Sequence, residues 1–172
     1  INSPVFSAEA RKADPARMLE AYHQSAATLN LLRAFARGGL ADLEQVHKWN
    51  LGFVKNAGSG TEKFEHLAEQ ISQALAFMEA CGINTKNSPT LRETAFYTSH
   101  EALLLPYEEA LTRIDSLSGE PYCCSAHMLW IGERTRGLDD AHVHFLSGVK
   151  NPIGCKMGPS ATAGDIIKIA NK

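Results

Sequence analysis

Two stretches decide the fold class: residues 121–136 read PYCCSAHMLWIGERTR, and residues 151–160 read NPIGCKMGPS. Short apolar runs of this kind, bounded by loop-forming residues, predict buried strands over residues 122–128 and 152–157. A helical pattern follows each strand, from about Asp139 to Gly148 and again from Thr162, where Asp165 completes a capping box. The C-terminal part of the chain is therefore expected to alternate strand and helix.

A third unit precedes these two. Residues 94–98 are rich in β-forming residues, and a helix is expected from Pro106 to about Arg113. Three β/α units in about 80 residues suit a doubly wound parallel sheet or part of a (β/α)₈ barrel. A complete barrel takes roughly 250 residues, so a barrel built from this chain alone would be incomplete.

The first half of the chain has a helical pattern. A helix begins at Asp14-Pro15 and ends at Gly38-Gly39, where glycine stops the apolar repeat. A second helix is expected from Asp42 until the breaker NAGSG at residues 56–60, and a third over residues 61–80. We expect a loop over residues 84–90. The domain organisation is then a helical segment over residues 1–90, including a helix pair, and three β/α units over residues 91–172.

Charge and hydropathy exclude several classes of protein. The 172 residues include 17 Lys and Arg against 19 Asp and Glu, a net charge of −2, so there is no basic field for nucleic acid or anionic membranes. No apolar run approaches the ~20 residues of a membrane helix, and residues 1–12 do not resemble a signal peptide. We expect a cytoplasmic protein or a mature organellar chain, in which any bound anion meets local cations.

The cysteines and histidines do not form a recognisable metal motif. The four cysteines lack C-x-x-C spacing, which favours buried free thiols over disulfides or zinc ligands. His100-Glu101 begins an H-E-x-x-H pattern, but Leu104 stands where the second histidine is required. No metal ligand is assigned in this chain.

Chemically useful side chains follow the expected strands. In both candidate architectures function gathers at the carboxyl ends of the strands, where we expect Glu101, His127, the 130–136 segment and Lys156. Arg and Lys bind carboxylate or phosphate oxygens, and a nearby Glu can move a proton. Glu133 and Arg134 could instead form a surface ion pair. Lys156 is harder to explain structurally, because burying a lysine in a central strand requires an anionic partner.

Several long strings of the sequence occur in a fixed order along the chain. They are residues 14–18 (DPARM), 24–35 (QSAATLNLLRAF), 99–108 (SHEALLLPYE), 125–136 (SAHMLWIGERTR), 139–143 (DDAHV) and 151–159 (NPIGCKMGP). These strings resemble the class II (plant-type) 3-deoxy-D-arabino-heptulosonate 7-phosphate (DAHP) synthases, and the similarity extends over essentially the whole chain.

The resemblance implies a (β/α)₈ TIM barrel with added helices and a condensation of phosphoenolpyruvate with erythrose 4-phosphate, the first step of the shikimate pathway. It also implies a divalent metal, manganese or cobalt, with ligands that lie outside this chain, and a homo-oligomer. By resemblance, phosphoenolpyruvate is bound by Glu133, Arg134 and Lys156, with Trp130 as a wall of the pocket. Glu101 lies near the aldose phosphate and His127 lies in the same site, so Lys156, Glu101 and His127 are the candidate catalytic residues.

The resemblance further implies that the chain is a fragment, since it corresponds to the region from after the family's second strand to the helix after the fifth. We expect this polypeptide alone to be inactive. Two alternatives stay open: a barrel aldolase acting on a phosphorylated sugar through a Schiff base on Lys156, and a non-catalytic homologue that serves as an interaction or regulatory module. The segment 42–80 corresponds to an insertion that contributes to inhibitor sites and subunit contacts in some members, although helix packing alone also explains it.

Overall fold

The computed structural model describes residues 3–56 and 60–172. The chain divides into two compact units, residues 1–96 and residues 97–172, which are described separately below. The sequence places this division at residue 90. None of the described helices combines the length and the apolar character that crossing a membrane requires.

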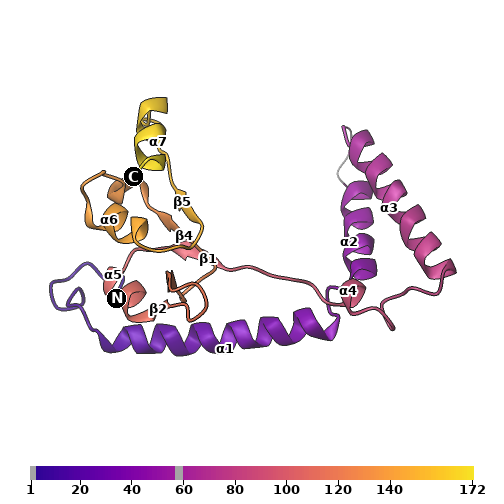
Figure 1. The fold of residues 1–172 in the computed structure, drawn as a ribbon, viewed down its shortest axis with the longest axis horizontal. Coiled ribbons are helices and arrows are strands. Elements are labelled where there is room, and N and C mark those ends of the chain that lie inside the picture. The colour runs from indigo at the N-terminus through magenta and orange to yellow at the C-terminus, as the bar shows by residue number, and fades with distance from the viewer. Residues whose placement is uncertain (1–2, 57–59) are drawn as a thin grey trace. The chain divides into compact units, whose positions relative to one another are not determined.

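The first unit is helical, as expected (Figure 1). Its elements are α1 (Ala16–Gly38), α2 (Leu43–Asn56), α3 (Glu62–Ala80) and the short α4 (Pro89–Arg92). The end of α1 is confirmed at glycine, because Gly39 adopts a left-handed φ of 84° and its N–H donates to the carbonyl of Phe35. The expected loop over residues 84–90 instead ends in the helical turn α4, where Pro89 occupies a first-turn position. Part of the breaker at residues 56–60 lies outside the described residues.

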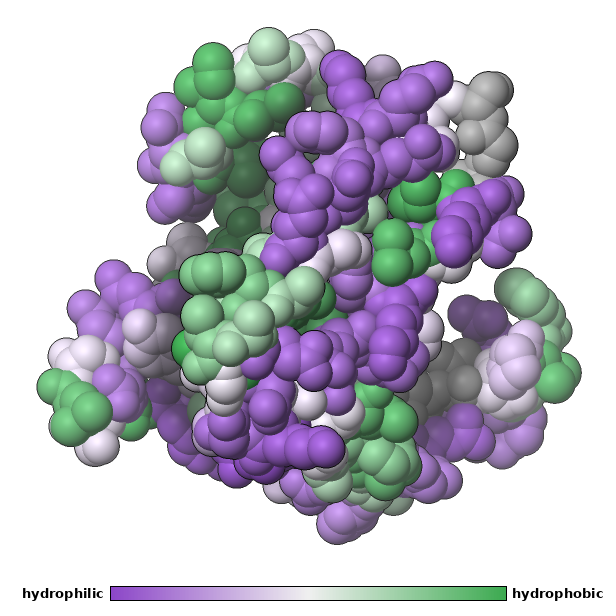
Figure 2. All heavy atoms as spheres, turned by 90° about the vertical axis from the view of Figure 1, so that its right-hand side faces the viewer, coloured by the Kyte–Doolittle hydropathy of each residue, from purple (hydrophilic) through white to green (hydrophobic). Residues whose placement is uncertain are grey.

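Helices α2 and α3 lie side by side (Figure 1). A 2.6 Å hydrogen bond joins the buried His47 of α2 to Ser72 of α3. Packing of the pair still leaves large apolar side chains exposed, including Trp49, Phe53, Phe64, Leu67 and Phe77. Figure 2 shows green, hydrophobic patches among the purple, hydrophilic surface.

The second unit, whose residues are all described, contains a three-stranded parallel sheet in the order β1-β4-β5. Its strands are β1 (Ser99–Glu101), β4 (Met128–Ile131) and β5 (Ile153–Cys155). Helices α5 (Leu105–Leu111), α6 (Ala141–Ser147) and α7 (Ala163–Ala170) follow the strands, and the capping box of Thr162 and Asp165 that opens α7 is confirmed. The unit is thus α/β, as predicted.

Two strand predictions are wrong in position. The first strand begins at Ser99 and does not cover residues 94–98, and the second covers Met128–Ile131 in place of residues 122–128. Pro121–Cys123 (β3) pairs instead with Thr112–Ile114 (β2) in an antiparallel hairpin. The turn between them explains the difference, because Asp115 accepts hydrogen bonds from Ser118 and Gly119 adopts a φ of 72°. The run MLWI alone has the apolar character of a central strand.

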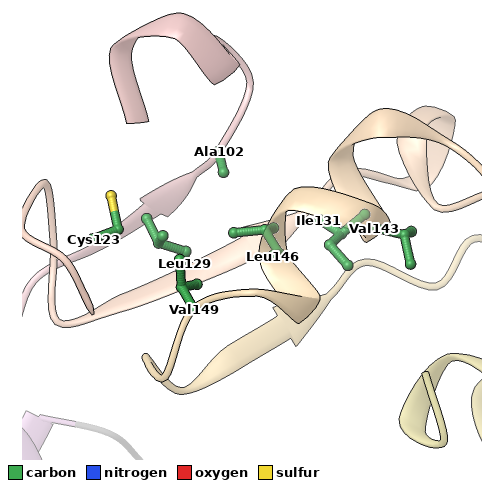
Figure 3. Packing of buried hydrophobic residues seen from close by; sticks show 7 residues of the cluster. All are labelled: Ala102, Cys123, Leu129, Ile131, Val143, Leu146 and Val149. Carbon is green, nitrogen blue, oxygen red and sulfur yellow. The ribbon is translucent and has the colours of Figure 1, made fainter. Parts of the chain in front are cut away.

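The core of the second unit lies where α6 packs on β4 (Figure 3). Leu129 and Ile131 of β4 are buried against Val143 and Leu146 of α6. The remaining members of this cluster are Ala102, Cys123 and Val149. Helix α6 therefore holds the central strand of the sheet in place through apolar contacts.

A buried side-chain amide fixes the segment between the hairpin and β4. Asn151 is 8% exposed, and its Oδ1 accepts the N–H of Cys123 at 2.8 Å. Its Nδ2 donates to the carbonyl oxygens of Cys123 and Ala126 at 2.9 and 3.1 Å. These bonds give hydrogen-bond partners to main-chain N–H and carbonyl groups that are shielded from water.

Replacing Asn151→Ala should lower the free energy of unfolding by about 2–4 kcal/mol, because a buried main-chain N–H and carbonyl lose their partners. Urea unfolding followed by tryptophan fluorescence measures this, in a Trp49→Phe background so that Trp130 alone reports. The exposed Asn171→Ala is the control and should change stability by less than about 0.5 kcal/mol. Equal losses in the two variants would contradict the role of Asn151.

Candidate functional site

The parallel register brings three strand ends together. Glu101 of β1 lies opposite Trp130 of β4, and Trp130 lies opposite Gly154 of β5. Because neighbouring parallel strands are about 4.8 Å apart, the residues that follow each strand share one edge of the sheet. The expectation that functional side chains meet at this edge rests on these pairings.

An ion pair crosses the edge from the first strand to the last. The Nζ of Lys156 donates to Oε2 of Glu101 at 2.7 Å, and it lies 5.6 Å from the ring centroid of Trp130. Glu101 also packs against Gly132, where a Cβ would overlap the carboxylate. The absence of a side chain at Gly132 therefore lets Glu101 reach across β4 to Lys156.

Lys156 does not lie within the strand. Strand β5 ends at Cys155, and the Lys156 side chain is 56% exposed just beyond it. The expectation that Lys156 is buried in a central strand is wrong, but the anionic partner that it was expected to need is present, since Lys156 pairs with Glu101. The ammonium group contacts one carboxylate and one aromatic face, and the exposure of the side chain leaves it accessible to a ligand.

The charge of Glu101 is stabilised by its surroundings. The hydrogen bond from Lys156 lowers the pKa of Glu101 most strongly; burial opposes this, and the Lys156 and Arg134 charges add to the lowering. Arg134 is exposed on the short helix η1 (Glu133–Thr135) directly after β4. Glu101 is thus an ionised acceptor at neutral pH, and two cations lie close to it.

The indole of Trp130 lies beside both charged groups. Lys156 lies over its ring, and the buried indole N–H is near enough to the Glu101 carboxylate to help lower the pKa of Glu101. An indole N–H is a donor only, so it favours the ionised form of that carboxylate. The role of Trp130 as a wall of the substrate pocket stays a prediction.

Glu133 is already engaged by protein groups. Its Oε2 accepts from Nε of Arg136 at 2.9 Å and from the N–H of Gly158 at 2.5 Å, and its Oε1 accepts from Nη2 of Arg136 at 3.1 Å. The hydrogen bonds from Arg136 are the main reason that the pKa of Glu133 is lowered. Glu133 therefore connects the segment after β4 to the segment after β5.

His127 lies at the opposite edge of the sheet from Glu101 and Lys156. It precedes β4, and its Nδ1 bonds the N–H and hydroxyl of Thr98, the residue before β1. The structure therefore does not bring His127 together with the other candidates, because the strand starts six residues later than predicted and His127 falls at its amino end. Its catalytic role stays a prediction.

A second polar cluster, which the sequence interpretation did not identify, lies behind β1. Glu108 of α5 is 2% exposed and accepts from His100 at 2.8 Å, Ser125 at 2.5 Å and Cys123 at 3.3 Å. Burial raises the pKa of Glu108, but these hydrogen bonds outweigh it and the net pKa is lowered. Nothing in the local sequence of α5 marks Glu108 as buried, since its partners come from positions up to 17 residues away.

The cysteines are all free, as expected, and all lie in the described part of the chain. Only Cys123 is buried, while Cys81 and Cys124 are exposed and Cys155 is intermediate, so the expected burial is wrong for most of them. Within residues 3–56 and 60–172, no group of three or more His, Cys, Asp and Glu side chains could hold a metal ion. The described residues do not fit a metal site.

Replacing Lys156→Met should raise the pKa of Glu101 toward its ordinary value, because the largest stabilising contact of the carboxylate is lost. Because the pKa of Glu101 is lower in the folded protein than in the unfolded chain, its ionised carboxylate stabilises the fold at pH values above the unfolded-state pKa. This stabilisation is lost as the pH falls through the folded-state pKa. The difference in unfolding free energy between the Lys156→Met variant and the unsubstituted chain should therefore disappear in acid. Carbon-detected NMR titration of the Glu101 carboxyl group measures the shift.

Lys150→Met is the matched control, since Lys150 is similarly exposed and pairs with Glu120 in a different region. It should leave the titration of Glu101 unchanged. A Glu101 titration that is the same in the Lys156 variant and in the unsubstituted chain would contradict the ion pair.

Comparison with known proteins places the chain in a family. The profile of the Class-II DAHP synthetase family matches residues 1–172. A phospho-2-dehydro-3-deoxyheptonate aldolase of Streptomyces coelicolor is 53% identical over 168 residues, covering 98% of this chain and 36% of the relative. Phospho-2-dehydro-3-deoxyheptonate aldolase AroG of Mycolicibacterium smegmatis is 44% identical over 167 residues, covering 94% of this chain and 35% of the relative. The chain spans about a third of the length of these curated relatives, and it belongs to the Class-II DAHP synthetase family.

Proposed function

We propose that this chain carries the phosphoenolpyruvate side of a DAHP synthase active site, in which phosphoenolpyruvate condenses with erythrose 4-phosphate in the first step of the shikimate pathway. The observation that carries the proposal is the contact of Lys156 with both Glu101 and Trp130 at the carboxyl edge, with Arg134 beside them. The family membership and the names of the two relatives support the reaction.

The three parallel strands are proposed to be a section of a (β/α)₈ barrel. The order β1-β4-β5 joins strands that are successive parallel members of the sheet, and each is followed by a helix, as in a barrel wall. The β2-β3 hairpin is then an excursion between the first two strands of this section. The candidate residues stand at the edge where barrel enzymes place their active sites.

In the proposed site, Arg134 and Lys156 bind the phosphate and carboxylate oxygens of phosphoenolpyruvate. Two exposed cations close to one edge reduce the repulsion between two phosphorylated substrates, which is the main electrostatic obstacle to bringing them together. Trp130 offers its ring beside Lys156, and Glu133 directly precedes Arg134 on η1.

The condensation forms one carbon–carbon bond, and at C2 it replaces the carbon–oxygen bond to phosphate with a carbon–oxygen bond to the oxygen of water. C3 of phosphoenolpyruvate attacks the aldehyde carbon, whose oxygen takes up a proton; water adds to C2 with loss of a proton, and inorganic phosphate leaves from C2. Lys156 stabilises the negative charge that develops on the adduct, as preorganised donors do in other enzymes. Glu101, ionised and bonded to Lys156, orients that ammonium group and is close enough to accept a proton.

The family generally depends on a divalent metal, and we propose that the ligands of manganese or cobalt come from segments outside these 172 residues, because the described ones hold no suitable group. A homo-oligomer is proposed on the same family basis. The bacterial relatives support a cytoplasmic location, with the plastid as the plant equivalent.

The Schiff-base alternative is less well supported by the geometry. Lys156 lies 2.7 Å from a carboxylate as an ammonium group, and an ammonium group has no lone pair with which to attack a carbonyl. Trapping with borohydride distinguishes the two reactions, since only a Schiff base leaves a substrate adduct on Lys156.

A chimera tests the proposal. This chain replaces the matching 168-residue segment of the Streptomyces relative, and the chimera is assayed for phosphate release from phosphoenolpyruvate with erythrose 4-phosphate. Activity is expected to be retained. Introducing Lys156→Met should lower kcat/KM by roughly 10²–10³-fold, as for loss of a charged group that stabilises the transition state.

Lys150→Met in the same chimera is the control and should stay within about twofold, a change too small to reflect a lost active-site contact. A folded, metal-loaded chimera without activity would contradict the proposal that this chain carries the site. Full activity in the Lys156 variant would contradict the role of Lys156.

A further inference from the structure

The strongest unexplained feature near the site is the position of the Glu133 carboxylate. This carboxylate lies three residues before its partner Arg136 and directly before Arg134, in a segment that is proposed to bind an anion. A free negative charge there would repel phosphoenolpyruvate. The structure pairs that charge internally.

Arg136 makes the pairing through two parallel bonds. Its Nε and Nη2 reach the two oxygens of Glu133 at 2.9 and 3.1 Å, the fork geometry that distinguishes arginine from lysine. The Arg136 side chain is 19% exposed, so this contact is better shielded than an ordinary surface ion pair. Asp165, at the start of α7, also lies close enough to Arg136 to raise the pKa of the guanidinium further, after the larger effect of Glu133.

The same carboxylate holds the loop that carries Lys156. Oε2 of Glu133 accepts the N–H of Gly158, and a Cβ at Gly158 would lie 2.7 Å from Cδ and Oε1 of Glu133. The close approach requires glycine at this position. Arg136 thereby fixes Glu133, and Glu133 fixes the main chain two residues beyond Lys156.

We propose that Arg136 is a positioning residue, and that Glu133 serves the site through its bonds to Arg136 and Gly158 and not as a direct ligand of the substrate. This inference rests on the proposed function and refines it. The pair neutralises the Glu133 carboxylate and holds the segments that carry Arg134 and Lys156 at one distance, so that both cations stay available for the anion.

The first part of the test needs no substrate. Amide NMR spectra of the 172-residue chain are compared for Arg136→Gln, Arg136→Lys and the control Arg113→Gln. Arg113 is an exposed arginine of β2 that donates to the main-chain carbonyls of Ala110 and Thr112, so its removal changes the net charge equally. The Gly158 amide proton should move upfield and the Glu133 carboxyl pKa should rise in Arg136→Gln, with an intermediate effect in Arg136→Lys and none in the control.

The second part measures phosphoenolpyruvate binding by the same spectra. Arg136→Gln should weaken binding by roughly tenfold, because an uncompensated carboxylate then faces the anion, while Arg113→Gln stays within about twofold. The double variant Glu133→Gln/Arg136→Gln should recover most of the affinity, since its side chain at 133 carries no charge. Simple loss of stability would not be rescued by a second substitution.

The outcomes separate the two claims. An unchanged Gly158 amide and Glu133 titration in Arg136→Gln would overturn the inference whether or not substrate binds. A double variant as weak as Arg136→Gln would overturn the electrostatic part. Absence of any phosphoenolpyruvate-dependent shift in the unsubstituted chain would count against the proposed function, while the first part still decides whether Arg136 positions Glu133 and Gly158.

Discussion

The constraint on which the rest depends is the parallel register of β1, β4 and β5. Pairing of Glu101 with Trp130 and of Trp130 with Gly154 puts three strand ends at one edge within the reach of single side chains. A shift of one residue in any strand would turn its side chains to the other face of the sheet. The contact of Glu101 with Lys156, across the central strand, is possible only in this register.

The two acidic side chains at this edge each pair with a cation, and neighbouring glycines leave room for these pairs. Glu101 reaches Lys156 over Gly132, and Glu133 reaches Arg136 and the main chain of Gly158. In each case a Cβ on the glycine would occupy the space of the carboxylate. The two acidic residues are thereby neutralised, and the exposed Arg134 and the half-exposed Lys156 remain the cations that an anionic ligand would meet.

Buried polar groups also stabilise the arrangement of the three strands. Asn151 satisfies the main chain between β3 and β4, and Glu108 gathers His100, Ser125 and Cys123 around one carboxylate. Such groups are costly unless every bond is made, so they favour one packing over its alternatives. Together with the apolar contacts of α6 on β4, they fix the central strand on which the site depends (Figure 3).

The sequence by itself determined the helices, the α/β class, the helix caps at Gly39 and Thr162, and the family, because these depend on local spacing and on long ordered strings. It also singled out Glu101, Trp130, Arg134 and Lys156; the structure places the first two within β1 and β4 and the other two just after β4 and β5. Only the tertiary structure decided the strand positions, the opposite placement of His127, and the partners of Glu133 and Glu108. Strand pairing and burial depend on residues distant in the chain. The turn after Asp115 pairs Pro121–Cys123 with Thr112–Ile114 in a hairpin, although the sequence predicts a central strand that begins at residue 122.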